Sequence, residues 1–341
     1  MEWNPPQDAA YLKDAIRWPQ NHETMEIRII EVPKRIHRKL PGFSKRQMFE
    51  YIAKNVGVRR AKGRFVLVTN PDDLFSEELI AYLASNRLSE ECFYRVDRYD
   101  FHALAPEGAD APAILDFAKR HIYHFCRGYP RKFHNRLAMS IANWYSQSPH
   151  ALRRVWNRCA RVLFAFLGIT EPGSRIGWLQ RWRALRTGKW PCSYDGYERS
   201  SNTESTFSLS ADGPFVVGLD SIHHEASGDF LLASIDDWMK IKGHPEFTDT
   251  YHHMDSYATY QLKAVGLKQA LFLPPCMIIH ADHERIRARA KSFSGVQSSK
   301  WLEDLRKIQA GLLGPTINGD DWGLASEDLP ETVVCKVLRS D

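Results

Sequence analysis

The sequence lacks the features that would set it apart from ordinary globular proteins. Its six cysteines in 341 residues include no Cys-x-x-Cys pair, so we expect reduced thiols rather than a disulfide scaffold or a thiolate zinc site. The longest unbroken apolar run, Val162 to Ile169, has eight residues, whereas a helix that spans a bilayer needs about 20. The first residues show no basic stretch and no apolar core, so we expect no secretory signal.

The overall composition is that of a folded, water-exposed protein. The hydrophobic fraction is 43% and the charged fraction is 26%, and these values exclude wholesale disorder, collagen and fibres. A chain of this length suits one large or two medium-sized domains. With no signal and no membrane span in view, we expect a cytoplasmic protein.

The net charge of +5 is distributed unevenly along the chain. Residues 116–190 contain fifteen Lys or Arg, two acids and five of the ten tryptophans, so their net charge is +13. The rest of the chain carries 31 basic and 39 acidic residues, a net charge of −8. This shift marks a basic, Trp-rich insert in an acidic protein. We therefore predict four parts, at 1–104, 105–192 (the insert), 193–284 and 285–341.

Hydrophobic patterning in the first hundred residues predicts an α/β fold. The expected elements are a strand over 25–32, a helix over 45–61, a strand over 65–68, a helix over 76–84 and a strand over 93–97. Strands that alternate with helices are typical of a sheet with right-handed crossovers. The continuous apolar run at 65–68 is typical of a strand buried on both faces of a parallel sheet.

The insert and the later part of the chain show further elements. Two helices are expected in the insert, from 149 to 168 and from 174 to 188, with a polar loop over 193–213 after them. The elements expected beyond the loop are a strand over 215–219, a turn at 228–230, helices over 236–241 and 256–265, and strands over 269–273 and 277–280. The region 284–328 is polar and is predicted to be partly helical.

Four short motifs carry side chains that could do chemistry. Asn70-Pro71-Asp72 follows a buried strand, where ligands bind in open α/β sheets, although an Asp there also forms turns and helix caps. Asp255, after His252-His253-Met254, could act as a general base or cap the helix that follows it. His280-Ala281-Asp282-His283 offers mixed metal ligands. Gly228-Asp229-Phe230 is either a plain turn or a turn whose carboxylate accepts from sugar hydroxyls.

Taken in order, these motifs resemble those of one enzyme family. The stretch Ala53-Lys54-Asn55-Val56-Gly57, the apolar strand at 65–68 and Asn70-Pro71-Asp72 resemble the GT-A glycosyltransferases of the family-2 type. Gly228-Asp229-Phe230, Asp237-Trp238, Gly243-His244-Pro245-Glu246 and His253-Met254-Asp255 are similar to the C-terminal half of galactosyltransferase-type members. The likeness covers roughly residues 44–100 and 215–284. It implies a GT-A fold, Rossmann-like with a mostly parallel sheet, interrupted here by the basic helical insert.

The resemblance also implies roles for individual residues. Asp72 would bind a divalent metal, Mn²⁺ or Mg²⁺, together with His280, and His283 is a further candidate ligand. Asp255 would be the catalytic base. The residues implied in nucleotide binding are Glu2, Lys54, Asn55, Asn70 and Asp72. Those implied on the acceptor side are Gly228, Asp229, Trp238 and Glu246.

Two positions depart from the family pattern. Asn70 stands where the family usually carries an Asp that faces the ribose, and Lys54 replaces the usual Arg, which keeps the charge but loses the bidentate fork. The chain also shows no strand before residue 25 other than Glu2-Trp3, which looks like the end of the second strand of the fold. The resemblance then implies that Glu2 contacts the uracil and that the first strand of the fold is missing.

The resemblance thus predicts a metal-dependent glycosyltransferase. It would move a sugar from a nucleotide-diphosphate donor, UDP rather than GDP, to a glycan or a lipid-linked glycan, probing an anionic membrane surface with residues 116–190 from the cytoplasmic face. Inversion of the anomeric centre is expected. No nucleic-acid partner is expected, because the insert lacks a docking motif and the rest of the chain is acidic.

Other functions stay open from the residues alone. One is a catalytically inactive, glycosyltransferase-like partner protein. Another is a basic protein that binds membranes or nucleic acid through the insert. A metallohydrolase built on the His and Asp clusters is a third, although their spacing matches no motif such as His-Glu-x-x-His.

Overall fold

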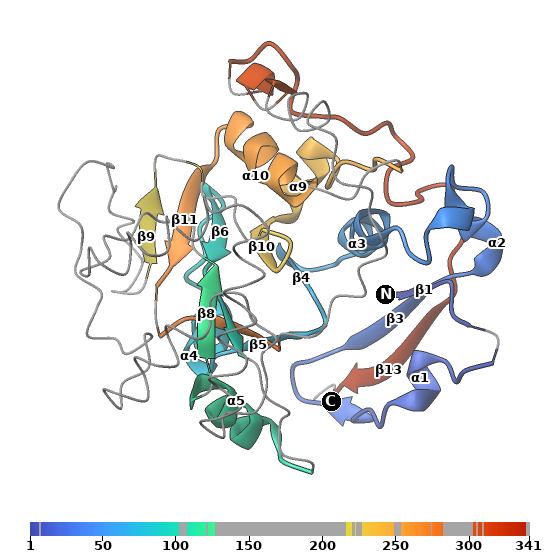
Figure 1. The fold of residues 1–341 in the computed structure, drawn as a ribbon, viewed down its shortest axis with the longest axis vertical. Helices are drawn as coiled ribbons and strands as arrows, with labels where there is room; N and C mark the ends of the chain where they lie inside the picture. Colours follow the sequence, from blue (N-terminus) through green and yellow to red (C-terminus); the bar gives the residue numbers. More distant parts are fainter. Residues whose placement is uncertain are drawn as a thin grey trace, which may run out of the picture.

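The computed structural model describes residues 1–6, 8–101, 108–120, 122–126, 216–219, 222, 227–248, 254–273, 275–281, 303–304, 306–308 and 310–338. These residues form an α/β protein with three mixed sheets. The helices are α1 (Leu12–Ala15), α2 (Lys34–His37), α3 (Glu50–Arg59), α4 (Glu77–Ala84), α5 (Ala111–Arg120), α9 (Ile235–Ile241) and α10 (Met254–Ala264), with a 3-10 turn at Phe43–Lys45. Figure 1 shows their arrangement.

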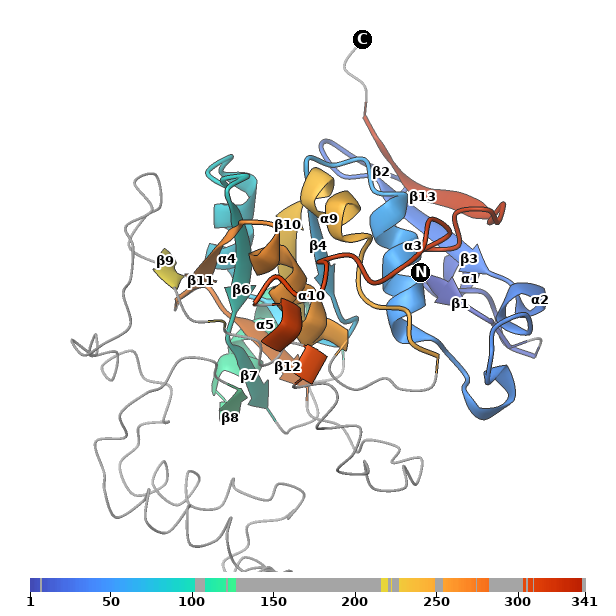
Figure 2. The ribbon, with the colours of Figure 1, turned by 90° about the horizontal axis from the view of Figure 1, so that it is seen from above.

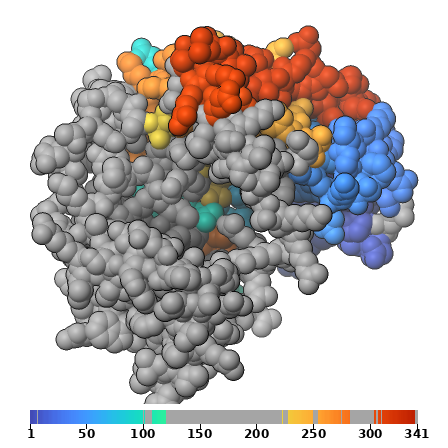
Figure 3. All heavy atoms as spheres, turned by 45° about the horizontal axis from the view of Figure 1, so that its top comes forward, coloured from blue at the N-terminus to red at the C-terminus, as the bar shows by residue number. Residues whose placement is uncertain are grey.

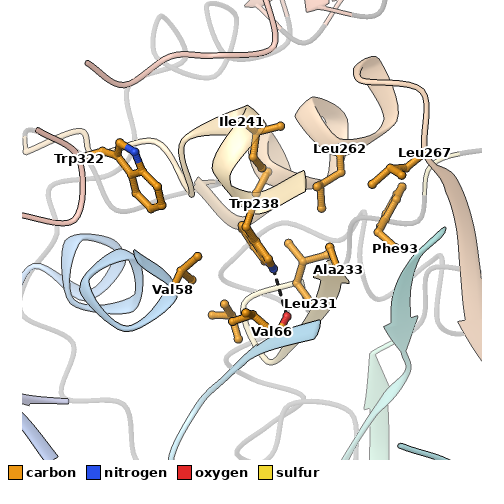
Figure 4. Packing of buried hydrophobic residues seen from close by; sticks show 12 residues of the cluster. Val58, Val66, Phe93, Leu231, Ala233, Trp238, Ile241, Leu262, Leu267 and Trp322 are labelled. Atoms are coloured by element: carbon orange, nitrogen blue, oxygen red, sulfur yellow. Dashed lines mark hydrogen bonds between the residues drawn. The ribbon is translucent and has the colours of Figure 1, made fainter. Parts of the chain in front are cut away.

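A five-stranded sheet forms the centre of the molecule. Its strands are β4 (Phe65–Thr69), β10 (Phe230–Ser234), β6 (Cys92–Val96), β11 (Lys268–Phe272) and β9 (Val216–Leu219), in that order across the sheet. Side chains alternate between its two faces, as the period of a strand requires. One face packs against α9 and α10 through a cluster that includes Val66, Leu231 and Trp238 (Figure 4). The other face packs against α4.

A second, four-stranded sheet adjoins the first. It contains β5 (Asp73–Phe75), β12 (Ile278–Ala281), β7 (Arg98–Phe101) and β8 (Ile122–Cys126). β5 follows β4 after a short turn, and β7 follows β6 after one residue. The chain therefore passes from the central sheet into the small sheet twice, and the residues at these two passages are brought close together.

A third sheet joins the two ends of the chain. Its strand order is β1 (Glu2–Trp3), β3 (Ile27–Val32), β13 (Glu331–Val337) and β2 (Asn21–His22). Helix α3 lies between this sheet and β4 (Figures 1 and 2). Its residues Ile52, Ala53 and Val56 pack on the N-terminal sheet, whereas Val58 packs on the core of the central sheet. In Figure 3 the C-terminal segment runs over the surface towards the N-terminal part.

Most predicted elements are confirmed within one to three residues. The strand over 65–68 is β4, the helix over 76–84 is α4, and the strand over 93–97 is β6. Ser76 and Ser234 cap α4 and α9 by accepting hydrogen bonds from Leu79 N and Asp237 N. The predicted helix over 45–61 is shorter than expected, because Arg46 is extended and α3 begins at Glu50.

The α/β class is confirmed, but the expected mostly parallel sheet is not seen. Of the ten strand pairs in the described residues, six are antiparallel and four are parallel. The strand β10 runs against both of its neighbours, β4 and β6. An apolar run that is buried on both faces shows the same pattern in either pairing, so the sequence could not distinguish them.

Most of the basic insert lies outside the described residues, which include α5 and β8 but nothing from 127 to 215. The two helices predicted at 149–168 and 174–188, and their contact with a membrane, stay predictions. Among the helices that the structure describes, none has the length and apolar character needed to cross a bilayer.

Candidate functional site

The end of β4 and the start of β10 bring Asn70 and Asp229 together. Thr69 is paired with Phe230 in the antiparallel register, so the next residue of one strand faces the previous residue of the other. The amide Nδ2 of Asn70 donates to Oδ1 of Asp229 at 2.6 Å, and Nη1 of Arg98 donates to Oδ2 at 2.7 Å. Asp229 is only 5% exposed. Both of its oxygens therefore serve the interior of the site, not an open acceptor surface.

The hydrogen bond from Asn70 gives a physical reason for its departure from the family pattern. An Asp at this position would put a second carboxylate about one hydrogen-bond length from Asp229, and like charges at that distance cannot both ionise cheaply. An amide supplies the donor that Asp229 needs. At its other end Oδ1 of Asn70 accepts from Nζ of Lys54 at 2.7 Å.

Lys54, on the exposed edge of α3, reaches into the same cluster. Its Nζ donates to Oε1 of Glu50 at 2.8 Å, to Oδ1 of Asn70 and to the carbonyl of Gly228 at 2.9 Å. It also lies 5.1 Å from the ring centroid of Tyr51. The side chain is 10% exposed.

Asp255 stands in the first turn of α10, as predicted. Its Oδ2 accepts from the hydroxyl of Ser227 at 2.8 Å and from the backbone N–H of Gly228 at 2.9 Å. Within the described residues Oδ1 has no hydrogen-bond donor. A Cβ on Gly228 would lie 3.3 Å from the hydroxyl of Tyr51 and 3.5 Å from Oδ2 of Asp255, so a glycine lets this turn approach both groups.

Asp72 and His280 meet at the edge of the small sheet. Nε2 of His280 and Oδ2 of Asp72 are 3.0 Å apart, and the antiparallel pairing of β5 with β12 places His280 opposite Asp73. Burial raises the pKa of Asp73 to about 7, and the negative charges of Asp229 and Asp72 add to this increase, whereas His280 opposes it. Negative charge thus accumulates around one imidazole.

A divalent cation fits part of this arrangement. A carboxylate and an imidazole are ligands that Mn²⁺ accepts, and Oδ1 of Asp73 is buried with no hydrogen-bond partner among the described residues. The described part of the chain contains no group of three or more His, Cys, Asp or Glu side chains that could hold a metal. Asp282 and His283, which come next after β12, lie outside it.

Several side chains in and beside this cluster were not predicted from the sequence. Arg95 in β6 is fully buried. Burial lowers its pKa to about 10, and the charges of Asp255, Asp229 and Asp97 oppose that decrease. The signal in the sequence was the run Arg95-Val96-Asp97-Arg98, because charged residues in a strand with no exposed face need partners.

Tyr51 was also missed, because its helical spacing suggests a core residue. It is 8% exposed, and its ring lies 5.2 Å from that of His244. Burial raises the pKa of the Tyr51 hydroxyl well above its usual value, and nearby Asp255 adds to the effect. The hydroxyl therefore stays protonated beside Asp255.

Three predicted site residues have structural surroundings instead. Trp238 is fully buried in the core of the central sheet, and its Nε1 donates to the carbonyl of Val66 (Figure 4). Asn55 is fully buried and its amide bonds to the backbone of His244 and to Oε1 of Glu246. Glu246 also accepts from the N–H of Gly323, and burial raises its pKa.

Glu2 lies apart from this cluster, in the N-terminal sheet. It pairs with Glu31 across β1 and β3, and its Oε1 accepts from the backbone N–H of Leu12 at 2.6 Å. A contact with a uracil base stays a prediction.

The predicted residues thus fall into two groups. Those brought together are Lys54, Asn70, Asp72, Gly228, Asp229, Asp255 and His280, and those placed elsewhere are Glu2, Asn55, Trp238 and Glu246. Comparison of the chain with models of protein families, with curated proteins and with solved structures finds no match.

Proposed function

We propose that this chain is a glycosyltransferase of the GT-A type that transfers a sugar from a nucleotide-diphosphate donor to a hydroxyl of an acceptor. One observation carries the proposal. A chain of hydrogen bonds from Asp255 through Gly228, Lys54 and Asn70 leads to the turn that bears Asp72 beside His280. A base and a pair of metal-type ligands therefore share one edge of the sheet.

In this proposal Asp255 accepts the proton of the acceptor hydroxyl. Two donors hold its Oδ2 in place, and these are the Ser227 hydroxyl and the Gly228 N–H. Its other oxygen can receive the proton as the acceptor oxygen attacks the anomeric carbon. A positioned base contributes roughly 10²–10⁴-fold to a rate. Direct displacement of this kind inverts the anomeric centre.

Asp72 and His280 would hold Mn²⁺ or Mg²⁺, with His283 as a further candidate ligand. The bound ion would neutralise charge on the leaving diphosphate. The proposal takes UDP as the nucleotide and a glycan or lipid-linked glycan as the acceptor. A cytoplasmic location, with the basic insert near an anionic membrane, belongs to the same proposal.

The first test is donor binding by the wild-type protein. UDP-sugars and GDP-sugars with Mn²⁺ should raise the melting temperature, because a ligand at 100 times its Kd stabilises the folded state by about 2.7 kcal/mol. UDP-sugars should be the more effective. No shift with any nucleotide sugar would contradict the proposal.

The second test is the variant Asp255→Asn, which keeps the shape of the side chain but cannot accept the proton. We expect UDP release in the presence of acceptor to fall by roughly 10²–10⁴-fold, with the thermal shift by UDP and Mn²⁺ retained. Asp236→Asn, in the exposed first turn of α9, is the matched control and should keep full activity. Undiminished transfer by Asp255→Asn would dismiss the assignment of the base.

A further inference from the structure

The ammonium group of Lys54 is saturated by protein acceptors. A lysine ammonium has three N–H donors, and three acceptors surround this one. They are Oε1 of Glu50 at 2.8 Å, Oδ1 of Asn70 at 2.7 Å and the carbonyl of Gly228 at 2.9 Å. Only 10% of the side chain is exposed. A lysine that grips a bound diphosphate would need at least one of these donors for the ligand.

These acceptors belong to three segments that are far apart in the sequence. Glu50 is one turn before Lys54 on α3, Asn70 ends the passage from β4, and Gly228 lies in the turn before β10. Two of the segments lead directly to the proposed chemistry. Asp72 is two residues after Asn70, and the N–H of Gly228 donates to Oδ2 of Asp255 at 2.9 Å.

Asp229 closes the connection between the same two segments. It accepts from Nδ2 of Asn70 and also from Nη1 of Arg98, and it follows Gly228 directly in the chain. The turn at 227–229 is thus held from one side by Lys54 and from the other by Asn70 and Arg98. Because Asp229 is buried, charged hydrogen bonds of this kind are strong and costly to break.

We propose that Lys54 is a positioning residue, which fixes the end of β4 relative to the Ser227–Asp229 turn and so sets the placement of Asp255 relative to Asp72. This inference rests on the proposed function only for its catalytic consequence. It departs from the role in nucleotide binding that the family resemblance implies for Lys54.

The shape of the donor group distinguishes the two roles. An ammonium directs its three N–H bonds to different sides, whereas a guanidinium is planar and offers its donors in one plane. Arginine would keep the charge that attracts a diphosphate but could not reproduce three bonds to these three acceptors. Lys54→Arg should therefore preserve a diphosphate-binding role and fail in a positioning role.

The experiment compares Lys54→Met and Lys54→Arg with the wild type and with Lys62→Met. Lys62 is the matched control, since its side chain is 72% exposed and its one ion pair, with Glu26, is 3.8 Å long. Hydrogen–deuterium exchange is measured in peptides that cover 66–73, 227–231 and 77–84. The full-length chain is used throughout, with UDP-glucose, UDP-galactose and Mn²⁺ as the probes for turnover.

Positioning predicts that both Lys54 variants exchange roughly tenfold or more faster at 66–73 and 227–231, with 77–84 unchanged. Lys62→Met should match the wild type everywhere. In turnover, both Lys54 variants should lose about 100-fold in kcat, while KM for the UDP-sugar changes by no more than roughly threefold. Diphosphate binding predicts the opposite result, with KM raised in Lys54→Met and restored in Lys54→Arg.

Unchanged exchange in Lys54→Met, or rescue by Lys54→Arg, would overturn the proposal. If Lys54→Met fails to fold, Asn70→Ala removes one of the three acceptors, and faster exchange at 227–231 is expected of it. No effect there would equally overturn the proposal. Since exchange needs no substrate, a wild type without transferase activity refutes the proposed function and leaves the exchange result to decide on Lys54.

Discussion

Tyr51 and His244 are neighbouring rings that burial affects in opposite ways. The pKa of Tyr51 is raised by burial, so its hydroxyl remains a donor. The pKa of His244 is lowered well below its usual value, first by burial and then by the positive charge of Lys54. In each case burial favours the neutral form, because a charge loses its hydration inside the protein. The ring that packs behind Tyr51 is therefore uncharged at neutral pH.

His244 is also costly to bury as a polar group. Its ring lies between Trp238, 5.0 Å away, and Tyr51, and neither ring nitrogen has a hydrogen-bond partner among the described residues. A buried polar group without a partner costs about 1–3 kcal/mol. The backbone of His244 is well satisfied by Asn55, so the cost belongs to the imidazole alone.

We therefore expect His244→Phe to raise the free energy of unfolding by about 1 kcal/mol at pH 7.5. The gain should grow as the pH falls below about 6.5, because the unfolded wild type binds a proton there and the folded one does not. The wild type then loses stability towards lower pH, with a slope of at most about 1.4 kcal/mol per unit from this group. Urea unfolding at pH 7.5 and 5.5 measures both effects.

His22→Phe, at an exposed position of β2, is the control for that experiment and should follow the pH dependence of the wild type. A His244→Phe variant with the wild-type slope between pH 5.5 and 7.5 would show that the imidazole is not held neutral by burial.

At the scale of elements, Asn55 connects α3 to the segment that follows α9. Its Nδ2 donates to the carbonyl of His244 at 2.7 Å and to Glu246 at 2.9 Å, and its Oδ1 accepts from the N–H of His244 at 2.8 Å. Gly243 and Gly323 both have positive φ and pack against Asn55, where a Cβ would clash. The helix and two loops are thus fitted around one amide.

Asn55→Ala removes these three hydrogen bonds and leaves buried backbone groups without partners. We expect the free energy of unfolding to fall by about 3 kcal/mol, since each such bond contributes roughly 1 kcal/mol. Urea denaturation gives this quantity directly. Asn21→Ala, on the exposed strand β2, should change it by less than about 0.5 kcal/mol. A loss below 1 kcal/mol in Asn55→Ala would argue that the amide is dispensable for joining these elements.

At the scale of the whole molecule, the C-terminal segment holds the N-terminal sheet in place. β13 lies between β3 and β2 in the strand order. Just before it, the guanidinium of Arg60 donates to the carbonyls of Gly323, Leu324 and Glu327. Trp322 packs in the core of the central sheet and Leu324 in that of the N-terminal sheet. One C-terminal segment therefore contributes to both cores.

Deletion of residues 330–341 should uncover the edge of β3 and release β2. We expect faster hydrogen exchange over 27–32 and self-association in size-exclusion chromatography, because an exposed strand edge pairs with other chains. Exchange in β4 and β10 should stay near the wild-type rate, since those strands pair within the central sheet. Removal of residues 339–341 alone is the control. A deletion variant that remains monomeric with wild-type exchange over 27–32 would contradict this role of β13.

The elements predicted with success are those whose signals are local. The apolar run of β4, the serine caps of α4 and α9 and the periodicity of α10 each depend on residues a few positions apart. The site residues that the structure gathers were found for the same reason. Asn70, Asp72, Gly228 and Asp255 lie where strands end or helices begin, and such positions can be recognised in a sequence.

What only the tertiary structure decided is which strands pair and which polar groups meet. The direction of β10, the place of β13 and the burial of Trp238 depend on contacts between residues far apart in the chain. Nothing in the residues near Lys54 indicates that its three acceptors would come from α3, β4 and the turn before β10. The sequence by itself determined the local elements and the polar positions at their ends, because those follow from neighbouring residues. The tertiary structure decided which of these positions share one site, because long-range packing brings them together.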